Sequence, residues 1–194
     1  MSDKITGYTE ATPKAMTTGA AVVFKDFDLA TDTAETAETK ILGATSGGVS
    51  VKVAKETWSH EIDGLPENTK GNMEIESVMP TVEFELAEVS SVNALSAALG
   101  AAESKAAAKP DGYTEVSAKD LTNADYFQNL TLITRTKVGN TPLIIVIDNP
   151  LNHDDFEVST EYKAGGRLKC TFTGNYDPLD VNKHPIRFYV PTNG

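Results

Sequence analysis

GATSGGVSVKVAKETW, residues 43–58, joins a Gly/Ser/Thr-rich loop directly to a segment of alternating valines. Val49, Val51 and Val53 alternate with polar residues, which indicates a strand with one buried face. The loop lacks the Gly-Lys-Ser/Thr ending of a phosphate-binding loop, and a strand follows where such loops need a helix N-terminus. We therefore expect a structural turn that opens a strand, and not a nucleotide site.

The apolar positions change parity inside this segment. Trp58, His60 and Ile62 are even-numbered, whereas the three valines are odd-numbered. Because a shift of one residue turns every side chain to the other face, the change predicts a bulge or bend between Ala54 and Thr57. We expect one long, bent strand with Trp58 in the core, a subunit contact being the alternative for that side chain.

The period of two continues through the chain, in short segments that end at Gly, Pro, Asn or Asp. Residues 156–162 and 168–172 flank KAGG and predict a hairpin. A helical pattern is clear only in SSVNALSAALG, residues 90–100, where Ser90 or Ser91 caps the start and Gly100 ends the helix. The chain is thus predicted to be mainly β, a β-sandwich or partly open barrel with one flanking α-helix. The expected core residues are Val49, Val51, Trp58, Ile62, Val82, Phe84, Leu86, Leu95, Leu99, Leu168 and Phe172.

The length of 194 residues fits a single domain over residues 1–194. Residues 25–40 and 63–72 are polar, with little to bury, and we expect extended loops that a partner would order. Residues 101–112 are rich in Ala and Lys and end in Pro110-Asp111-Gly112, which predicts a surface connector between two halves.

The charge balance excludes several classes of partner. Seventeen basic residues stand against 28 acidic ones, for a net charge of −11. Tight binding to nucleic acid or to an anionic membrane draws on Lys and Arg, so neither is expected. The longest apolar run, residues 143–147, is far shorter than the roughly 20 residues of a membrane helix. Cys170 has no partner for an internal disulfide and residues 1–10 hold no signal-peptide pattern, so we expect folding in a cytoplasm.

The candidate chemical groups do not form a catalytic pattern. Residues 152–155, Asn-His-Asp-Asp, offer oxygen and imidazole ligands, but consecutive residues on a strand point to opposite faces. His60 is expected to be a packed histidine, His184 part of a turn, and Cys170 a buried thiol between Leu168 and Phe172. We expect no catalytic residue, no metal and no cofactor.

The order of these segments resembles a known family. Residues 41–100 have a Gly-rich entry, a strand ending in Asp-Gly, an excursion closed by Lys-Gly, a Glu-rich strand and a helix ending in Leu-Gly. Residues 156–178 and 184–191 are similar to closing strands of the same kind. This arrangement resembles the major tail tube proteins of long-tailed, siphovirus-type bacteriophages.

The resemblance implies a β-sandwich with a flanking helix, six subunits in a ring, and rings stacked into a hollow tube that delivers the genome into the host cell. It implies a late structural protein of the virion tail, assembled in the host cytoplasm and not an enzyme. Its partners would be other copies of itself and the tape-measure, tail-terminator and baseplate proteins. Duplex DNA would pass as cargo without tight binding.

On this hypothesis four glutamates line the lumen, where their negative charge lets DNA slide: Glu74, Glu76, Glu83 and Glu85. A solvated acidic face, or a pair of catalytic carboxylates, is the alternative for these residues. The expected contacts between rings or subunits are Asp26 and Asp28 in the first loop and Asp63, Gly64, Leu65, Pro66, Glu67, Asn68, Thr69 and Lys70 in the second.

A shared barrel is physically reasonable, because eight strands enclose only side chains and 16 to 18 leave a water channel. Six subunits that gave about four strands each would form a barrel of roughly 24 strands with a wide lumen. Three other functions fit the same pattern: a monomeric β-sandwich that binds carbohydrate or a host surface, an enzyme with paired carboxylates, and the inner tube of a contractile tail.

Overall fold

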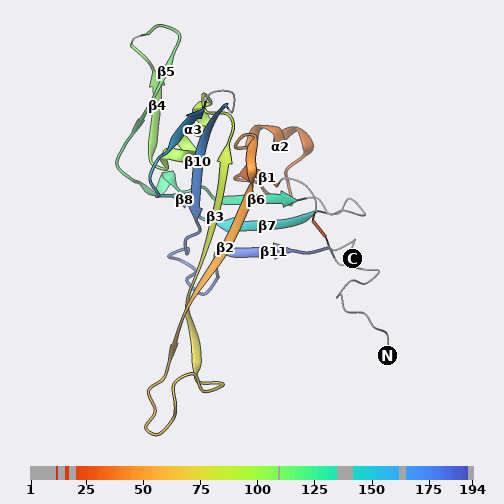
Figure 1. The fold of residues 1–194 in the computed structure, drawn as a ribbon, viewed down its shortest axis with the longest axis vertical. Coiled ribbons are helices and arrows are strands. Elements are labelled where there is room, and N and C mark those ends of the chain that lie inside the picture. Colours follow the sequence, from red (N-terminus) through yellow and green to blue (C-terminus); the bar gives the residue numbers. More distant parts are fainter. Residues whose placement is uncertain are drawn as a thin grey trace.

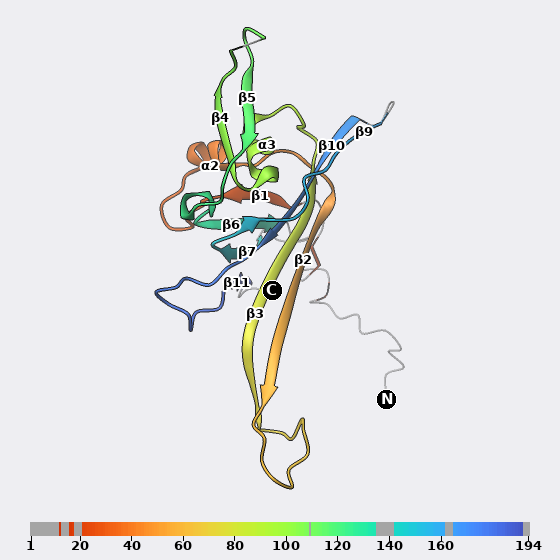
Figure 2. The ribbon, with the colours of Figure 1, turned by 90° about the vertical axis from the view of Figure 1, so that its left-hand side faces the viewer.

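Two antiparallel β-sheets packed face to face form the body of the computed structural model, which describes residues 12, 16–17, 21–108, 110–134, 142–161 and 165–191 (Figures 1 and 2). The first sheet has the strand order β1 (Val22–Lys25), β6 (Asn129–Thr134), β7 (Leu143–Asp148) and β11 (Ile186–Tyr189). The second has the order β2 (Thr45–Ser59), β3 (Met73–Leu86), β10 (Gly165–Thr173) and β8 (Leu151–Asn152), and β9 (Val158–Glu161) also pairs with β10. In Figure 1 the strands of one sheet run across those of the other. The predicted mainly β sandwich is confirmed.

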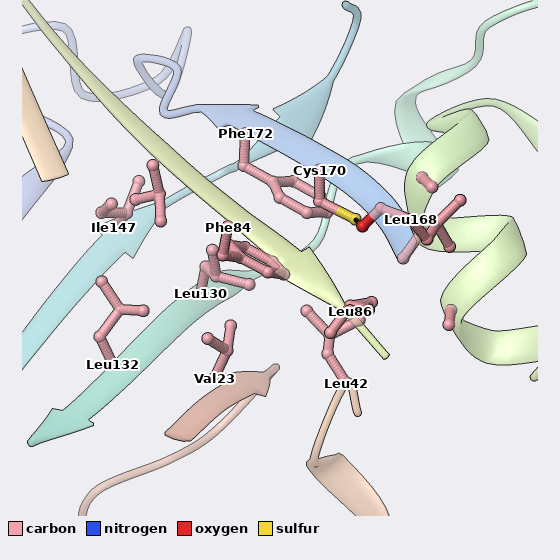
Figure 3. Packing of buried hydrophobic residues seen from close by; sticks show 14 of the residues in the cluster. Val23, Leu42, Phe84, Leu86, Leu130, Leu132, Ile147, Leu168, Cys170 and Phe172 are labelled. Carbon is pink, nitrogen blue, oxygen red and sulfur yellow. Dashed lines mark hydrogen bonds between the residues drawn. The ribbon is translucent and has the colours of Figure 1, made fainter. Parts of the chain in front are cut away.

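The core lies between the two sheets (Figure 3). Five of the expected core residues are fully buried there, at 4 % exposure or less: Val82, Phe84, Leu86, Leu168 and Phe172. They come from β3 and β10 and face Leu130, Leu132 and Ile147 of the first sheet. Val49, Val51 and Leu95 are partly buried against this cluster. The alternation that marked these strands therefore does separate a core face from an outer face.

The register of β2 against β3 corrects the prediction for Trp58 and Ile62, which are 44 % and 55 % exposed. The expected irregularity is present, between Glu56 and Thr57, but the extra residue is Glu76 on β3. Because β2 itself keeps its alternation, Trp58 points to the face opposite the three valines and pairs with Glu74. Ile62 lies beyond the end of the strand, where no second sheet covers it.

Helix α3 (Val92–Leu99) confirms the predicted helix. Ser91 is its N-cap, since the Ser91 hydroxyl accepts a hydrogen bond from the Ala94 N–H, and Gly100 is its C-cap. The buried face differs from the expected one: it consists of Ala94, Ala97 and Ala98, while Leu99 is only partly buried. Small residues lie on this face because α3 packs closely against β10 and β8.

A second helix, α2 (Ala34–Lys40), corrects the prediction that residues 25–40 form an extended loop. Thr33 and Thr36 form a capping box, in which each side chain accepts a hydrogen bond from the backbone N–H of the other. At the other end the Lys40 ammonium donates to the carboxylate of Asp32 at 2.8 Å and to the carbonyl of Asp26 at 2.7 Å. Local capping and one ion pair thus order a segment that has little apolar surface.

The predicted connector at residues 101–112 is also corrected. Residues 102–106 form β4 (Ala102–Ala106), which pairs with β5 (Thr114–Ala118) in a hairpin that stands clear of the body (Figure 1). Pro110-Asp111-Gly112 lies in its turn, so the break was predicted but the strand pairing was not. The one hairpin that was predicted, between residues 156–162 and 168–172, is confirmed by the pairing of β9 with β10, although residues 162–164 lie outside the described residues.

Candidate assembly surfaces

The most prominent feature of the molecule is a two-stranded arm, residues 54–77, which continues β2 and β3 far beyond the sandwich (Figure 2). With 15 residues, β2 spans roughly 50 Å at about 3.3 Å per residue. The arm carries five large apolar side chains that are 39–55 % exposed: Trp58, Ile62, Leu65, Met73 and Ile75. A surface of this kind on an extended element is typical of a contact site.

The end of the arm holds the second predicted loop, residues 63–72, and internal hydrogen bonds fix its shape. The Asn72 side chain donates to the carbonyl of His60 at 2.9 Å, and the Thr69 hydroxyl donates to the carbonyl of Pro66 at 2.6 Å. Residues 63–68 and Lys70 are exposed and Thr69 is partly buried, so most of the predicted contact residues are accessible. The structure gives them a defined surface that could bind without further ordering.

His60 lies at the base of this loop and not in a packed environment as expected, since its side chain is 49 % exposed. Its ring meets the Trp58 indole edge-on, with centroids 4.2 Å apart, and its Nε2 lies 3.3 Å from the Glu74 carboxylate. The side chain is exposed because the arm extends beyond the sandwich, where the first sheet does not cover it (Figure 2).

The predicted lumen glutamates lie on the outer face of the second sheet. Glu83 and Glu85 alternate with the buried Val82, Phe84 and Leu86, as expected. Glu74 shares their face, because the extra residue at Glu76 shifts the alternation by one position near the start of β3. The prediction placed all four glutamates on the lumen wall, but Glu76 is the extra residue of β3 and has no partner on β2.

Three basic residues share this face: Lys52 on β2, and Arg167 and Lys169 on β10. The alternation of the valines already put Lys52 on the polar face, but no prediction brought Arg167 and Lys169 to the glutamates. Arg167 forms an ion pair with Glu85, with Nη1 to Oε2 at 2.9 Å, and Lys169 lies directly opposite Glu85 in the register. Their alternation with Leu168 and Cys170 was a usable signal, but the pairing of β10 with β3 was needed to bring them to the glutamates. This face is therefore mixed in charge and not uniformly acidic.

The second sheet has an open edge. Strand β2 is paired with β3 along one side, and among the described residues no strand pairs with its other side. An edge of this length exposes a row of backbone donors and acceptors to pairing with another chain. The opposite edge of the sheet is made by β8 and β9.

Asp26 and Asp28, the other predicted contact residues, have local structural roles. Asp26 accepts a hydrogen bond from the Gln128 N–H at 2.7 Å and so ties this loop to the start of β6. Asp28 accepts from the Ala30 N–H at 2.9 Å and from the Thr31 hydroxyl at 2.8 Å, and these hydrogen bonds lower its pKa. Asp28 is exposed and accessible to a partner, whereas Asp26 is partly buried.

Of the remaining candidate groups, Asn152, Cys170 and His184 are engaged in the fold, whereas His153, Asp154 and Asp155 are exposed. The Asn152 side chain is buried and donates to the carbonyl of Ala98, joining β8 to α3. Burial raises the pKa of the Cys170 thiol to about 12, which keeps it protonated and unreactive at neutral pH. The Nδ1 atom of His184 lies within hydrogen-bond distance of the Tyr176 hydroxyl, at 3.2 Å, and that hydroxyl accepts a hydrogen bond from the Val78 N–H. Within the described ranges, no group of three or more His, Cys, Asp or Glu side chains could hold a metal ion.

Comparison with known proteins adds no assignment: no protein-family model matches this chain, and none of the curated proteins searched is significantly similar to it. In the described part of the chain, no helix has the length and apolar character needed to span a membrane.

Proposed function

We propose that this protein is the structural subunit of a bacteriophage-type tail tube, in which rings of copies stack into a hollow conduit for DNA. The open edge of β2 carries the proposal. Fifteen residues of strand are paired on one side only, and their outer part packs on nothing in the described chain. Pairing with a neighbouring copy would satisfy this edge and prevent uncontrolled aggregation.

The two edges of the second sheet differ, so the contact between copies joins unlike surfaces. β2 of one copy would meet β8 and β9 of the next, and a head-to-tail contact of this kind closes into a ring when the rotation per copy allows it. The path β2–β3–β10–β8 is four strands wide. Six such sheets give a barrel of roughly 24 strands, wide enough for an aqueous bore.

Only one face of that barrel can line the bore, because the first sheet covers the other face. Glu74, Glu83 and Glu85 would then face the lumen, as the family resemblance implies. Arg167 and Lys169 would face it too, so the wall would be nearly balanced in charge instead of strongly acidic. Salt screens such charges beyond about 8 Å at physiological ionic strength, and DNA would pass without being held.

The exposed aromatic side chains give no support to a carbohydrate-binding module. Those of the described residues are spread over four places: Trp58 on the arm, Tyr113 at the tip of the β4–β5 hairpin, Phe156 before β9, and Phe188 and Tyr189 on β11, where consecutive residues point to opposite faces. A stacking platform for sugars would bring several of them together.

In the tail, the remaining partners would be tape-measure, terminator and baseplate proteins, within the virion.

Negative-stain electron microscopy of the purified protein over a range of concentrations, with light scattering on the same samples, tests the proposal. We expect hollow rings or tubes with six-fold end views, and a scattering mass that rises with concentration. A monomer at every concentration would contradict it.

A further inference from the structure

A cleft of about 480 Å³ opens at one end of the first sheet, where three loops that are distant in the sequence come together. They are the turn before β6, the turn between β7 and β8, and the connection from β10 to β11. Small-molecule sites are typically clefts of about 300–1,000 Å³ that combine aromatic side chains with a few placed polar groups. The residues that give this cleft its chemistry are Asn123, Tyr126, Asn149, Asn175, Tyr176 and Asp177.

Two asparagines of the cleft are held in place by each other. The side-chain amide of Asn149 donates to the backbone carbonyl of Asn175 at 3.2 Å, and that of Asn175 donates to the carbonyls of Asn149 and Thr173, both at 2.9 Å. Asn149 has φ of 47°, a left-handed conformation that asparagine adopts more readily than most residues. Because both amide nitrogens donate to the backbone, the two side-chain oxygens, which have no donor among the described residues, remain as acceptors.

The connection from β10 to β11 adds an aromatic ring and a carboxylate. The Tyr176 hydroxyl accepts a hydrogen bond from the Val78 N–H of β3 at 2.8 Å, which fixes the ring. Oδ1 of Asp177 accepts from the Leu179 N–H at 2.9 Å, and its Oδ2 has no hydrogen bond with a described residue. These positions are set before a ligand arrives, which lowers the entropic cost of binding.

The turn before β6 supplies Asn123 and Tyr126, whose side chains make no hydrogen bond within the described part of the chain. The Asn123 amide and the Tyr126 hydroxyl are able to donate as well as accept. The cleft therefore suits a ligand that both donates and accepts at several atoms, as a compound with many hydroxyl groups does.

The charge of the cleft disfavours an anion. Among the described residues that line it, Asp177 is charged and none is Lys, Arg or His. Lys183 lines a smaller adjoining cleft, but its ammonium is paired with Asp148 at 3.2 Å. The net charge of −11 also repels anions.

We propose that this cleft binds a neutral sugar, either free or as the end of a glycan. Each hydroxyl of a sugar donates and accepts, and the C–H face of its ring packs on an aromatic side chain, which Tyr126 and Tyr176 supply. Both tyrosines are partly buried, so they are separate from the scattered exposed aromatic side chains. The cleft holds a short sugar and is not the extended platform of a carbohydrate-binding module.

The cleft lies away from the bore of the proposed tube. That bore would face the outer side of the second sheet, whereas Figure 2 shows the connection from β10 to β11 on the side of the molecule away from β2. Every copy in a tube would then present a cleft on the other side of the wall, and weak single contacts with a glycan-coated surface would add up. One copy suffices for binding, so the site does not depend on tube formation.

Saturation-transfer-difference NMR on the purified full chain tests the site, with the methyl glycosides of glucose, galactose, mannose and N-acetylglucosamine as separate probes. We expect transfer to the ring protons of at least one probe. The uronate of the sugar that binds, in which a carboxylate replaces the hydroxymethyl group, should bind about threefold or more weakly, because Asp177 repels it.

Two substitutions distinguish the cleft from other surfaces. Tyr126→Ala removes an aromatic face and should raise the Kd by about tenfold, and Asn123→Ala, at an exposed position, should raise it by about threefold or more. Tyr113→Ala, the same change at an exposed tyrosine of the β4–β5 hairpin, is the matched control and should leave the Kd unchanged. Circular dichroism checks that each variant keeps the fold.

The absence of transfer to all four probes would overturn the sugar site. A Kd that both cleft variants leave unchanged would also overturn it, since the sugar would then bind elsewhere, and a uronate that binds as tightly as its neutral sugar would contradict the preference for a neutral ligand. Electron microscopy of the same samples reports tube formation separately, so a failure of the tube and a failure of the sugar site are distinguishable.

Discussion

At the scale of single residues, the centre of the core is a cluster of phenylalanines. Phe172 is 1 % exposed, and its ring centroid lies 5.9 Å from that of Phe84 and 5.6 Å from that of Phe127. It joins the two sheets, because Phe84 belongs to β3 and Phe127 precedes β6. Stability should depend strongly on this position.

Phe172→Ala is expected to lower the free energy of unfolding by about 3–5 kcal/mol, since it removes a buried ring and leaves a cavity. Urea unfolding followed by circular dichroism measures the change. Phe188→Ala is the control: Phe188 is 52 % exposed on β11, and its loss should cost about 1 kcal/mol or less. Equal losses of unfolding free energy at the two positions would show that Phe172 is not at the centre of the core.

A second prediction concerns Asp125, in the short 3₁₀ turn η1 (Asn123–Asp125) before β6. The hydrogen bond from the Lys119 ammonium, helped by the hydroxyl and N–H of Thr122, lowers the pKa of Asp125 from its ordinary 3.8 to about 2. A lowered pKa favours the folded state above pH 3.8, and that contribution disappears as the pH falls toward 2.

Asp125→Asn should therefore reduce the melting temperature at pH 6 and flatten its decline between pH 4 and pH 2. Thermal melts across this range, compared with Asp111→Asn at an exposed turn position, provide the measurement. An unaltered acid profile would mean that the Lys119 contact contributes nothing.

At the scale of elements, the end of α3 shows how closely the backbone approaches a neighbouring strand. Gly100 and Gly112 both have positive φ, 74° and 84°. A Cβ at Gly100 would overlap the backbone oxygen of Asn152 on β8, whereas a Cβ at Gly112 would meet no atom within 4 Å. Both glycines therefore have a left-handed backbone, but only Gly112 has room for a side chain.

Gly112→Ala should cost about 1–2 kcal/mol of stability, the cost of a left-handed residue with a side chain. Gly100→Ala should lose that amount and a further 1–3 kcal/mol or so, because β8 must move away from α3. Equilibrium unfolding of both variants separates the cost of the left-handed backbone from the cost of moving β8. Equal costs would place β8 farther from the helix than the structure has it.

At the scale of the whole molecule, the arm and the sandwich are nearly independent. The described core draws on β1, β3, β6, β7, β10 and α3, and the arm residues do not belong to it. The exposed apolar side chains of the arm do not belong to the core of the described residues. Under the proposed function, a second copy would bury them.

Deletion of Pro66 to Thr69 is therefore expected to leave the free energy of unfolding within about 1 kcal/mol of the wild type, since it shortens an exposed loop. The same deletion should block tube growth, which electron microscopy measures. Tubes of normal length from the shortened protein would remove the arm tip from the contact between rings.

The sequence by itself determined which residues of β3 and β10 enter the core, where α3 begins and ends, and that β9 and β10 form a hairpin. These features follow from alternation, caps and glycines, which act over a few residues. It also located the irregularity opposite Glu56, and it picked out the glutamates and the loop that now form the outer face and the arm tip.

Only the tertiary structure decided what covers each face. Trp58 has the pattern of a core residue, but its strand runs past the edge of the opposing sheet, so no partner buries it. The capping of α2 and the pairing of β4 with β5 overrode a composition that indicated a loop and a connector. The cations of β10 meet the glutamates of β3 through a pairing of strands about 80 residues apart in the chain. Burial and charge depend on such distant neighbours, which local periodicity does not specify.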